Sequence, residues 1–391
     1  MLRTPRPAAE PRRSPHAMRI YLDHNATAPL GPEVREAMLP FLGPPANPSS
    51  AHREGARARS ALETARAEVA ALVGAASAEI VFTSGATEAN NLALRGTAAG
   101  LGIVTTAIEH ASVLETARAL GAPLSVVPVD REGRVDAGQV VAACDAATRL
   151  VSVGLANGEV GSLAPVAAIT AGLRGNGVLV HSDAAQAAGR LPLDVAALGV
   201  DLLSLSAHKL GGPAGIGALW VRRGVELAAQ TTGGSQERGR RAGTENVAAI
   251  VGFGVAAARA RAELAANAAA AARLVERLWT GLRTRVPGVV RNGPADGPRL
   301  PNTLNVSFPG AAGESLLVLL DLAGVAVSLG SACAAGAAEP SHVLLAMGRD
   351  RDAARSGVRF SVGPSTTAAD IDRVLELLPA LVAQARGEAA A

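Results

Sequence analysis

Lysine is almost absent from this chain. Of the 37 basic residues only Lys209 is a lysine, and all the others are arginines. Aromatic residues are also scarce, at 2% of the 391 positions, and two cysteines, Cys144 and Cys333, are too few for a disulfide framework. No apolar run approaches the roughly 18 residues that a membrane-spanning helix needs. These scarcities predict a soluble cytoplasmic protein without a membrane partner.

A basic surface is the second missing feature. The formal net charge is +3, but four arginines against one glutamate in the first 17 residues account for all of it. Neither a basic stripe nor an aromatic stacking surface is left for a nucleic acid, so we exclude that class of partner. The same 17 residues are rich in proline and arginine and lack the apolar segment of a secretion signal. We expect a disordered leader there.

What the chain does contain is a regular alternation of apolar runs and helical stretches. Runs that are apolar on both faces and spaced by helices indicate an α/β fold, with a mostly parallel sheet between two helical layers. Ligands bind such sheets at the carboxyl ends of the strands. The seven runs are IVFTS (80–84), IVTT (103–106), LSVVPV (124–129), LVSVG (150–154), VLVHSD (178–183), LLSLS (202–206) and IGALWV (216–221).

Composition also divides the chain into parts. The alanine-rich stretch 246–285 predicts one or two long helices that lead from the sheet domain to a smaller α+β unit with a terminal helix over 368–386. We expect a leader over residues 1–17, an N-terminal segment over 18–30, a large domain over 31–262 and a small domain over 263–391.

Lys209 lies where chemistry is expected. It follows the apolar run 202–206 and precedes a glycine-rich turn, so it stands at the exit of a buried strand. An ammonium group can lose its proton and become a nucleophile, whereas guanidinium stays charged. Desolvation at a strand end would lower the pKa of the amine and favour a Schiff base with a carbonyl compound. The alternative, from the residues alone, is a surface lysine without a role.

Other polar residues follow neighbouring runs and would converge at the same edge of the sheet. Asp183 closes the run 178–183, where a carboxylate needs a cationic partner such as the protonated nitrogen of a pyridine ring. A helix cap is the alternative for this residue. Residues 84–87 open a helix and would present free amides to a phosphate. Together with Ser206 and His208 they predict a phosphate-binding cup.

Eight segments in this order resemble the cysteine desulfurases, which are pyridoxal-phosphate enzymes of the class V aminotransferase superfamily. The nearer match is the type with a long cysteine-bearing loop, and the resemblance runs from about residue 21 to residue 371. Eight ordered motifs are far more specific than any one of them. The segments are TSGATEANN (83–91), IEHASV (108–113), NGEVG (157–161), HSDAAQ (181–186), SAHKLGGPAGIGALWV (206–221), GGSQERGRRAGTEN (233–246), GSACAAGAAEPSHVL (330–344) and VRFSVG (358–363).

The resemblance implies a fold-type I enzyme whose large domain binds pyridoxal 5'-phosphate on a mixed, mostly parallel seven-stranded sheet. Lys209 matches the lysine that binds the cofactor covalently, and Asp183 matches the partner of the pyridine nitrogen. His110 matches the histidine that stacks on the ring and moves protons. The other implied cofactor contacts are Ala86, Thr87, Gln186, Ser206, His208 and, from the neighbouring subunit of a homodimer, Thr244.

The same resemblance implies the substrate and the sulfur chemistry. Asn157 and Arg359 match the groups that hold the carboxylate of L-cysteine, for which the planar fork of an arginine is suited. Cys333, in the small domain, matches the thiol that receives sulfur as a persulfide while L-alanine leaves. A scaffold or carrier protein would accept the sulfur for iron–sulfur cluster or thio-cofactor biosynthesis. No metal site is implied beyond a transient contact of Cys333 with a cluster, and residues 23–25 would line the mouth of the site.

Three alternatives stay open. Two share the fold, a selenocysteine lyase and another class V aminotransferase or lyase, and the thiol of Cys333 argues against an aminotransferase because transamination needs no thiol. The third alternative is a catalytically silent scaffold for sulfur assembly. The intact set of Lys209, Asp183 and Cys333 argues against it.

Overall fold

The larger domain is built on a seven-stranded sheet. The computed structural model describes residues 19–98, 100–330 and 340–388, so the predicted leader and Cys333 lie outside the described residues. Strand β8 runs antiparallel to both of its neighbours, and the other adjacent strands are parallel. The predicted mixed, mostly parallel sheet is confirmed, with β3 and β5 starting one and two residues before their predicted runs. In spatial order the strands are β2 (Ile80–Thr83), β8 (Gly217–Val221), β7 (Leu202–Ser206), β6 (Leu179–Asp183), β5 (Thr148–Ser152), β3 (Gly102–Thr106) and β4 (Leu124–Val127).

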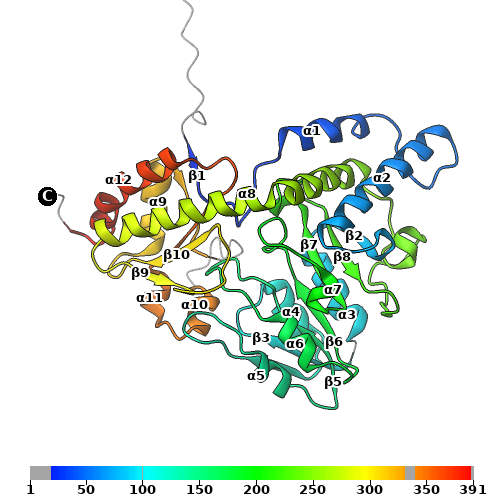
Figure 1. Ribbon diagram of the computed structural model, residues 1–391, viewed down its shortest axis with the longest axis horizontal. Helices are drawn as coiled ribbons and strands as arrows, with labels where there is room; N and C mark the ends of the chain where they lie inside the picture. Colours follow the sequence, from blue (N-terminus) through cyan, green and yellow to red (C-terminus); the bar gives the residue numbers. More distant parts are fainter. Residues whose placement is uncertain (1–18, 99, 331–339, 389–391) are drawn as a thin grey trace, which may run out of the picture.

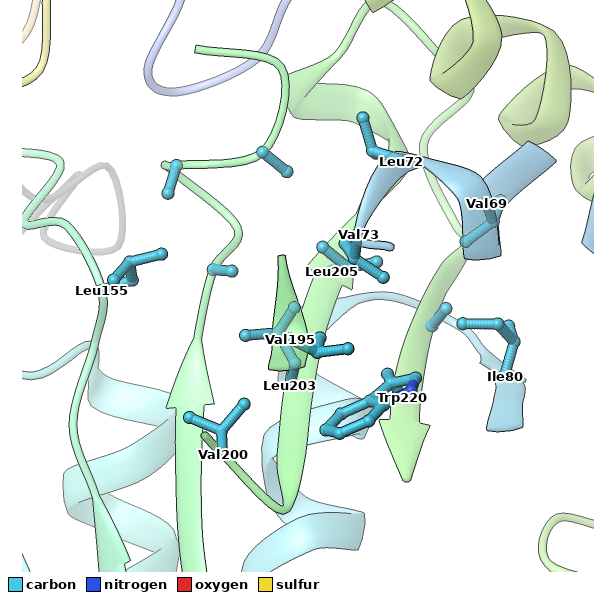
Figure 2. Close-up of a cluster of buried hydrophobic side chains, with 14 of the residues drawn as sticks. Val69, Leu72, Val73, Ile80, Leu155, Val195, Val200, Leu203, Leu205 and Trp220 are labelled. Carbon is cyan, nitrogen blue, oxygen red and sulfur yellow. The ribbon is translucent and has the colours of Figure 1, made fainter. Parts of the chain in front are cut away.

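Apolar side chains cover both faces of this sheet, as its parallel strands require. Strand β7 shows the alternation directly, because Leu203 and Leu205 enter one core while Leu202 enters the core on the opposite face. Figure 2 shows the first of these cores, where Trp220, the pairing partner of Leu203, and Val69 belong to the same cluster as the β7 leucines. Each fully buried leucine contributes about 1.5–3 kcal/mol of transfer free energy, so the strand that leads to Lys209 is held rigidly.

Helices flank the sheet and connect its strands. In the larger domain they are α1 (Pro32–Met38), α2 (Arg53–Leu72), α3 (Ala86–Thr97), α4 (Ala111–Ala119), α5 (Ala137–Ala142), α6 (Val166–Gly172) and α7 (Val195–Leu198), with the 3-10 turns η1 (Leu39–Phe41), η2 (Ser77–Glu79), η3 (Ala207–Lys209) and η4 (Gln236–Gly239). In the described part of the chain, no helix has the length and apolar character needed to cross a membrane.

The smaller domain has its own sheet and core. Strands β9 (Val290–Asn292), β10 (Thr303–Ser307) and β12 (Gly357–Ser361) form an antiparallel sheet in the order β12-β10-β9. Strand β1 (Ile20–Tyr21) pairs in parallel with β11 (Val325–Ala326), so the beginning of the described chain is attached to this domain. The helices are α9 (Gly313–Leu322), α10 (His342–Ala346), α11 (Arg351–Arg355) and α12 (Ala368–Ala385).

One helix, α8 (Val247–Arg285), joins the two domains (Figure 1). Its buried residues up to Ala260 pack in the core of the larger domain, and those from Ala271 onward pack in the core of the smaller one. The predicted stretch of one or two helices is therefore a single helix of 39 residues. The predicted domain boundary at 262/263 falls inside α8 and stays a prediction.

Gly217, the first residue of β8, lies where the sheet comes closest to the turn before α3. A Cβ at this position would lie 2.5 Å from the carbonyl oxygen of Leu205 and 2.6 Å from the Cα of Gly85. Both contacts are with backbone, which cannot move aside as a flexible side chain does. The turn at Gly85 is therefore positioned by the absence of a side chain on β8.

We predict that Gly217→Ala displaces this turn and lowers the free energy of unfolding by about 1–3 kcal/mol, the usual cost of overpacking. Urea denaturation measures the change. Gly43→Ala is the matched control, because a Cβ at Gly43 would meet nothing within 4 Å. Equal stabilities of the two variants would contradict the close approach.

Candidate active site

A cavity of about 450 Å³ opens at the carboxyl ends of β6 and β7. Its wall brings together most of the side chains that the sequence singled out, although they come from segments far apart in the chain. Thr244 is exposed and lies outside this wall, and its predicted reach into a neighbouring subunit stays a prediction. The predicted residues that line the cavity are Ala86, Thr87, His110, Asn157, Asp183, Gln186, Ser206, His208, Lys209 and Arg359.

Lys209 is the last residue of η3, the turn that follows β7. Its Nζ donates hydrogen bonds to the carbonyl oxygens of Asn25 and Ala26, the latter at 2.8 Å. Burial, together with the positive charges of Arg190 and Arg359, lowers the pKa of the amine to about 7. A large fraction of this amine is therefore neutral near pH 7, which is the nucleophilic form.

Asp183 ends β6 and faces the same cavity. Asn90 Nδ2 donates to Asp183 Oδ2 at 2.7 Å, and the amide of Ala185 donates to Oδ1 at 2.9 Å. Within the described ranges no basic side chain pairs with this carboxylate. Asp183 is thus oriented by neutral donors, and its negative charge is left to a cation in the cavity.

Asn90 is a residue that the sequence reasoning missed. It is fully buried in α3, and the same Nδ2 lies 2.9 Å from Ser112 Oγ. The sequence feature that could have identified Asn90 is its place in the motif over 83–91, where it is a polar residue on the inner face of a helix. Asn90 therefore links α3 to the strand end that carries Asp183.

The N-terminus of α3 forms one end of the cavity. Ala86 and Thr87 begin this 12-residue helix, and no side chain caps it. Its first amides are therefore open to an anion. His208 lies on the same wall, and burial together with the charge of Lys209 lowers its pKa to about 4, so this ring is neutral at pH 7. Free amides and a neutral imidazole are suited to hydrogen bonds with a phosphate.

His110 caps α4 from the cavity wall. Its Nδ1 accepts a hydrogen bond from the amide of Ser112 at 3.0 Å. Because Nδ1 is an acceptor, the neutral ring carries its proton on Nε2. The cap therefore fixes which nitrogen of His110 can donate a proton.

Arg359, on β12 of the smaller domain, also lines the cavity. Its Nη2 pairs with Asp23 Oδ1 at 2.6 Å, and its Nη1 donates to the carbonyl of Gly330 at 2.6 Å. Asp23, which was predicted at the mouth of the site, therefore holds this guanidinium in place. Asn157 also lines the cavity, but its side-chain oxygen accepts the amide of Glu159 at 2.8 Å and so shapes its own turn.

Glu159 joins the two described ends of the segment that carries Cys333. A Cβ at Gly330 would lie 2.6 Å from Glu159 Oε2, and Ser341 Oγ donates to the same oxygen at 2.5 Å. Gly330 and Ser341 therefore both lie beside one carboxylate oxygen of a residue on the cavity wall. Sequence reasoning missed Glu159 and Ser341, although both fall inside the quoted motifs.

The site matches a known family. Residues 20–374 match the aminotransferase class-V family, and the chain belongs to that family. A cysteine desulfurase of Cereibacter sphaeroides is 46% identical over 379 residues, which cover 94% of this chain and 97% of that protein. A cysteine desulfurase IscS of Dictyoglomus turgidum is 43% identical over 376 residues, with 94% and 95% covered. A solved structure described as a NifS-like protein superposes with a TM-score of 0.86 at 39% identity and covers 92% of this chain and 98% of its own.

Glu109 is a buried carboxyl group beside the cavity that sequence reasoning did not single out. It contacts Thr106 Oγ1 at 2.5 Å and accepts the amide of Gly154 at 2.7 Å. Burial raises its pKa to about 7, and the negative charge of Asp183 acts in the same direction. The folded chain therefore keeps this proton to a higher pH than the unfolded chain does.

We predict that this proton makes stability depend on pH. The contribution is fully present below the ordinary pKa of 4.5 and is lost as the pH rises from there to about 7. At about 1.4 kcal/mol per pKa unit, the loss amounts to a few kcal/mol. Glu109→Gln imitates the protonated carboxyl group and should lack this slope. Urea denaturation of both proteins between about pH 5 and pH 8 measures the difference, and parallel pH profiles would refute the assignment.

Proposed function

We propose that the chain is a pyridoxal 5'-phosphate-dependent cysteine desulfurase, which converts L-cysteine to L-alanine and transfers the sulfur to Cys333 as a persulfide. One observation carries the proposal: a single cavity holds an amine of lowered pKa, a carboxylate without a cation and the open N-terminus of α3. The relatives described above favour a cysteine desulfurase over the selenocysteine lyase, aminotransferase and scaffold alternatives.

The residues present fit the cofactor. The neutral amine of Lys209 is suited to an aldehyde, and Asp183 is suited to a protonated pyridine nitrogen. Ala86 and Thr87 would hold the phosphate through the amides at the start of α3, with Ser206 and His208 on the same wall. A cavity of about 450 Å³ has room for a ligand of this kind.

Proton transfer follows from the placement of two side chains. The bound cofactor withdraws electrons from the substrate Cα, which makes the Cα proton acidic and weakens the Cβ–S bond. Lys209, in its neutral form, accepts the Cα proton, and Asp183 keeps the ring nitrogen protonated by its negative charge. His110 supplies a donor at Nε2, since Nδ1 is engaged by the α4 cap.

Arg359 selects the substrate through its carboxylate. The guanidinium already bonds to Asp23 and to the Gly330 carbonyl, so an incoming carboxylate must share or replace one of these partners. A fixed guanidinium costs less to order on binding than a mobile one does. Amines without a carboxylate would lack this contact and bind more weakly.

The sulfur step balances with the thiol of Cys333. One cysteine and the Cys333 thiol give one alanine and one persulfide, and two equivalents of an external thiol then release sulfide and regenerate Cys333. The motif around Cys333 and the approach of Gly330 and Ser341 to Glu159, a residue of the cavity wall, support this role. We propose a cytoplasmic homodimer that delivers the sulfur to a scaffold or carrier protein for iron–sulfur cluster or thio-cofactor biosynthesis.

The function is tested by incubating the holoenzyme with L-cysteine and excess dithiothreitol while alanine and sulfide are measured together. We expect equal amounts of the two products. Pyruvate and ammonia in place of alanine would indicate elimination and refute the desulfurase assignment.

Lys209→Arg should abolish covalent cofactor attachment although it keeps the positive charge, because guanidinium stays protonated and is not a nucleophile. Borohydride reduction followed by mass spectrometry measures the adduct. The wild type should gain one cofactor mass on the tryptic peptide that contains residue 209. A reducible adduct in the variant would disprove the role of Lys209.

Cys333→Ser should retain the cofactor and bind L-cysteine but lose sulfide release by a factor of about 10² or more, since no thiol remains to accept sulfur. Cys144→Ser is the matched control and should keep wild-type activity, because Cys144 lies outside the cavity wall. Sulfide release by Cys333→Ser at the wild-type rate would refute the sulfur relay.

A further inference from the structure

A second cavity, of about 230 Å³, is lined by residues of α8 and of both domains. Lys209 lines this cavity as well as the first one. The cationic side chains on the wall of the second cavity, besides Lys209, are Arg190 and Arg259.

Arg190 is the unusual member of this wall. Its Nη1 donates to the carbonyl of Gln186 at 2.8 Å and also to Gln186 Oε1, and its Nη2 donates to the carbonyl of His24 at 3.2 Å. Within the described ranges no carboxylate pairs with it, whereas Arg259 pairs with Glu33. A partly buried guanidinium without a counterion is costly, and such a group is a candidate for a functional role.

Arg190 and Lys209 donate hydrogen bonds to three consecutive carbonyl groups of the N-terminal segment. The carbonyl of His24 accepts from Arg190, and the next two, of Asn25 and Ala26, accept from Lys209. Gln186, which bonds to Arg190, also donates to the Asn25 carbonyl at 3.0 Å. The same stretch of backbone therefore holds the positive charge of Arg190 and the amine of Lys209 near each other.

We infer that Arg190 is a positioning residue that keeps the Lys209 amine in its neutral, nucleophilic form. The inference rests on the proposed role of Lys209. Arg359 also lowers the pKa of Lys209, but Asp23 lies 2.6 Å from its guanidinium and offsets its positive charge. The positive charge of Arg190 has no such carboxylate beside it among the described residues, so it acts on Lys209 in full. The other charged or titratable groups that face Lys209 or the second cavity are Asp183, His208, His24, Arg259 and Glu263.

The charge states of these neighbours support the assignment. Burial lowers the pKa of Arg190 to about 10, so it remains charged at neutral pH. Both His208 and His24 have pKa values lowered to about 4 and are neutral there. Asp183 and Asp23 favour the charged form of Lys209, yet its pKa still lies near 7. Removal of the Arg190 charge should therefore raise the pKa of Lys209.

The single lysine of the chain makes the test direct. Lysine labelled with ¹³C at Cε gives one signal from the full-length, untagged protein without cofactor, and its chemical shift against pH gives the pKa of Lys209. We expect a wild-type midpoint near 7. Arg190→Gln should raise it by about one pH unit or more, as expected for two charges several ångströms apart at an effective dielectric of about 20. Arg259→Gln, on the wall of the same cavity, is the matched control and should leave the midpoint unchanged.

A second readout separates charge from structure. The rate of cofactor uptake against pH should shift upward in Arg190→Gln and by a smaller amount in Arg190→Lys, because a lysine at this position can lose its proton and keeps only part of the charge. The added lysine signal makes this readout preferable for Arg190→Lys. An unshifted Lys209 signal in Arg190→Gln would overturn the inference. If Arg190→Gln does not fold, an upward shift of the Arg190→Lys uptake profile supports the inference and an unshifted profile overturns it. Neither result alters the yields of alanine and sulfide expected of the wild type, so failure of this inference is distinct from failure of the proposed function.

Discussion

The short segment 23–26 holds the active site together, because its atoms bond to both domains at once. The side chain of Asn25 donates to the carbonyl of Gly158 in the larger domain at 2.9 Å and to Thr303 Oγ1 in the smaller domain at 2.8 Å. The carbonyl of the same residue accepts from Lys209. The orientation of the amine relative to the smaller domain therefore depends on this crossing segment as well as on α8. A displacement of either domain would move the carbonyl groups that accept from Lys209, even if the sheet did not change.

The charge balance of the cavity follows from how each group is held. Lys209 bonds to carbonyl oxygens and does not form an ion pair with Asp183, although both line the same cavity. If the two were paired, the amine would stay protonated and the carboxylate would be neutralised, and neither would be available to a cofactor. Burial raises the pKa of Glu109 to about 7, which reduces the negative charge at this carboxyl group near neutral pH. The site thus keeps the carboxylate of Asp183 separate from the nucleophilic amine of Lys209.

Residues whose position depends on local sequence could be predicted, and residues whose role depends on contacts across the fold could not. All seven strands of the large sheet overlap apolar runs, and in the inner strands this is because burial on both faces leaves a continuous signal. Lys209 and Asp183 stand at strand exits, which the same runs locate. Asn90 and Arg190 gave no such signal, since a polar residue in a helix or a turn is usually solvated. Their partners lie in other elements that only the folded chain brings near them.

Arginine occupies every basic position of this chain except 209, so Arg190 and Lys209 form a pair of two different kinds of cation. Near neutral pH a guanidinium keeps its proton, whereas an ammonium in the same surroundings can lose it. When the two lie near each other in a partly buried place, the lysine is the group that loses its proton first and relieves the repulsion. The opposite arrangement, with arginine at 209 and lysine at 190, would leave a charged group on the wall of the first cavity and place the neutral amine at 190. Arg190 and Lys209 therefore work as an ordered pair, in which the group that stays charged near neutral pH sets the state of the group that titrates there.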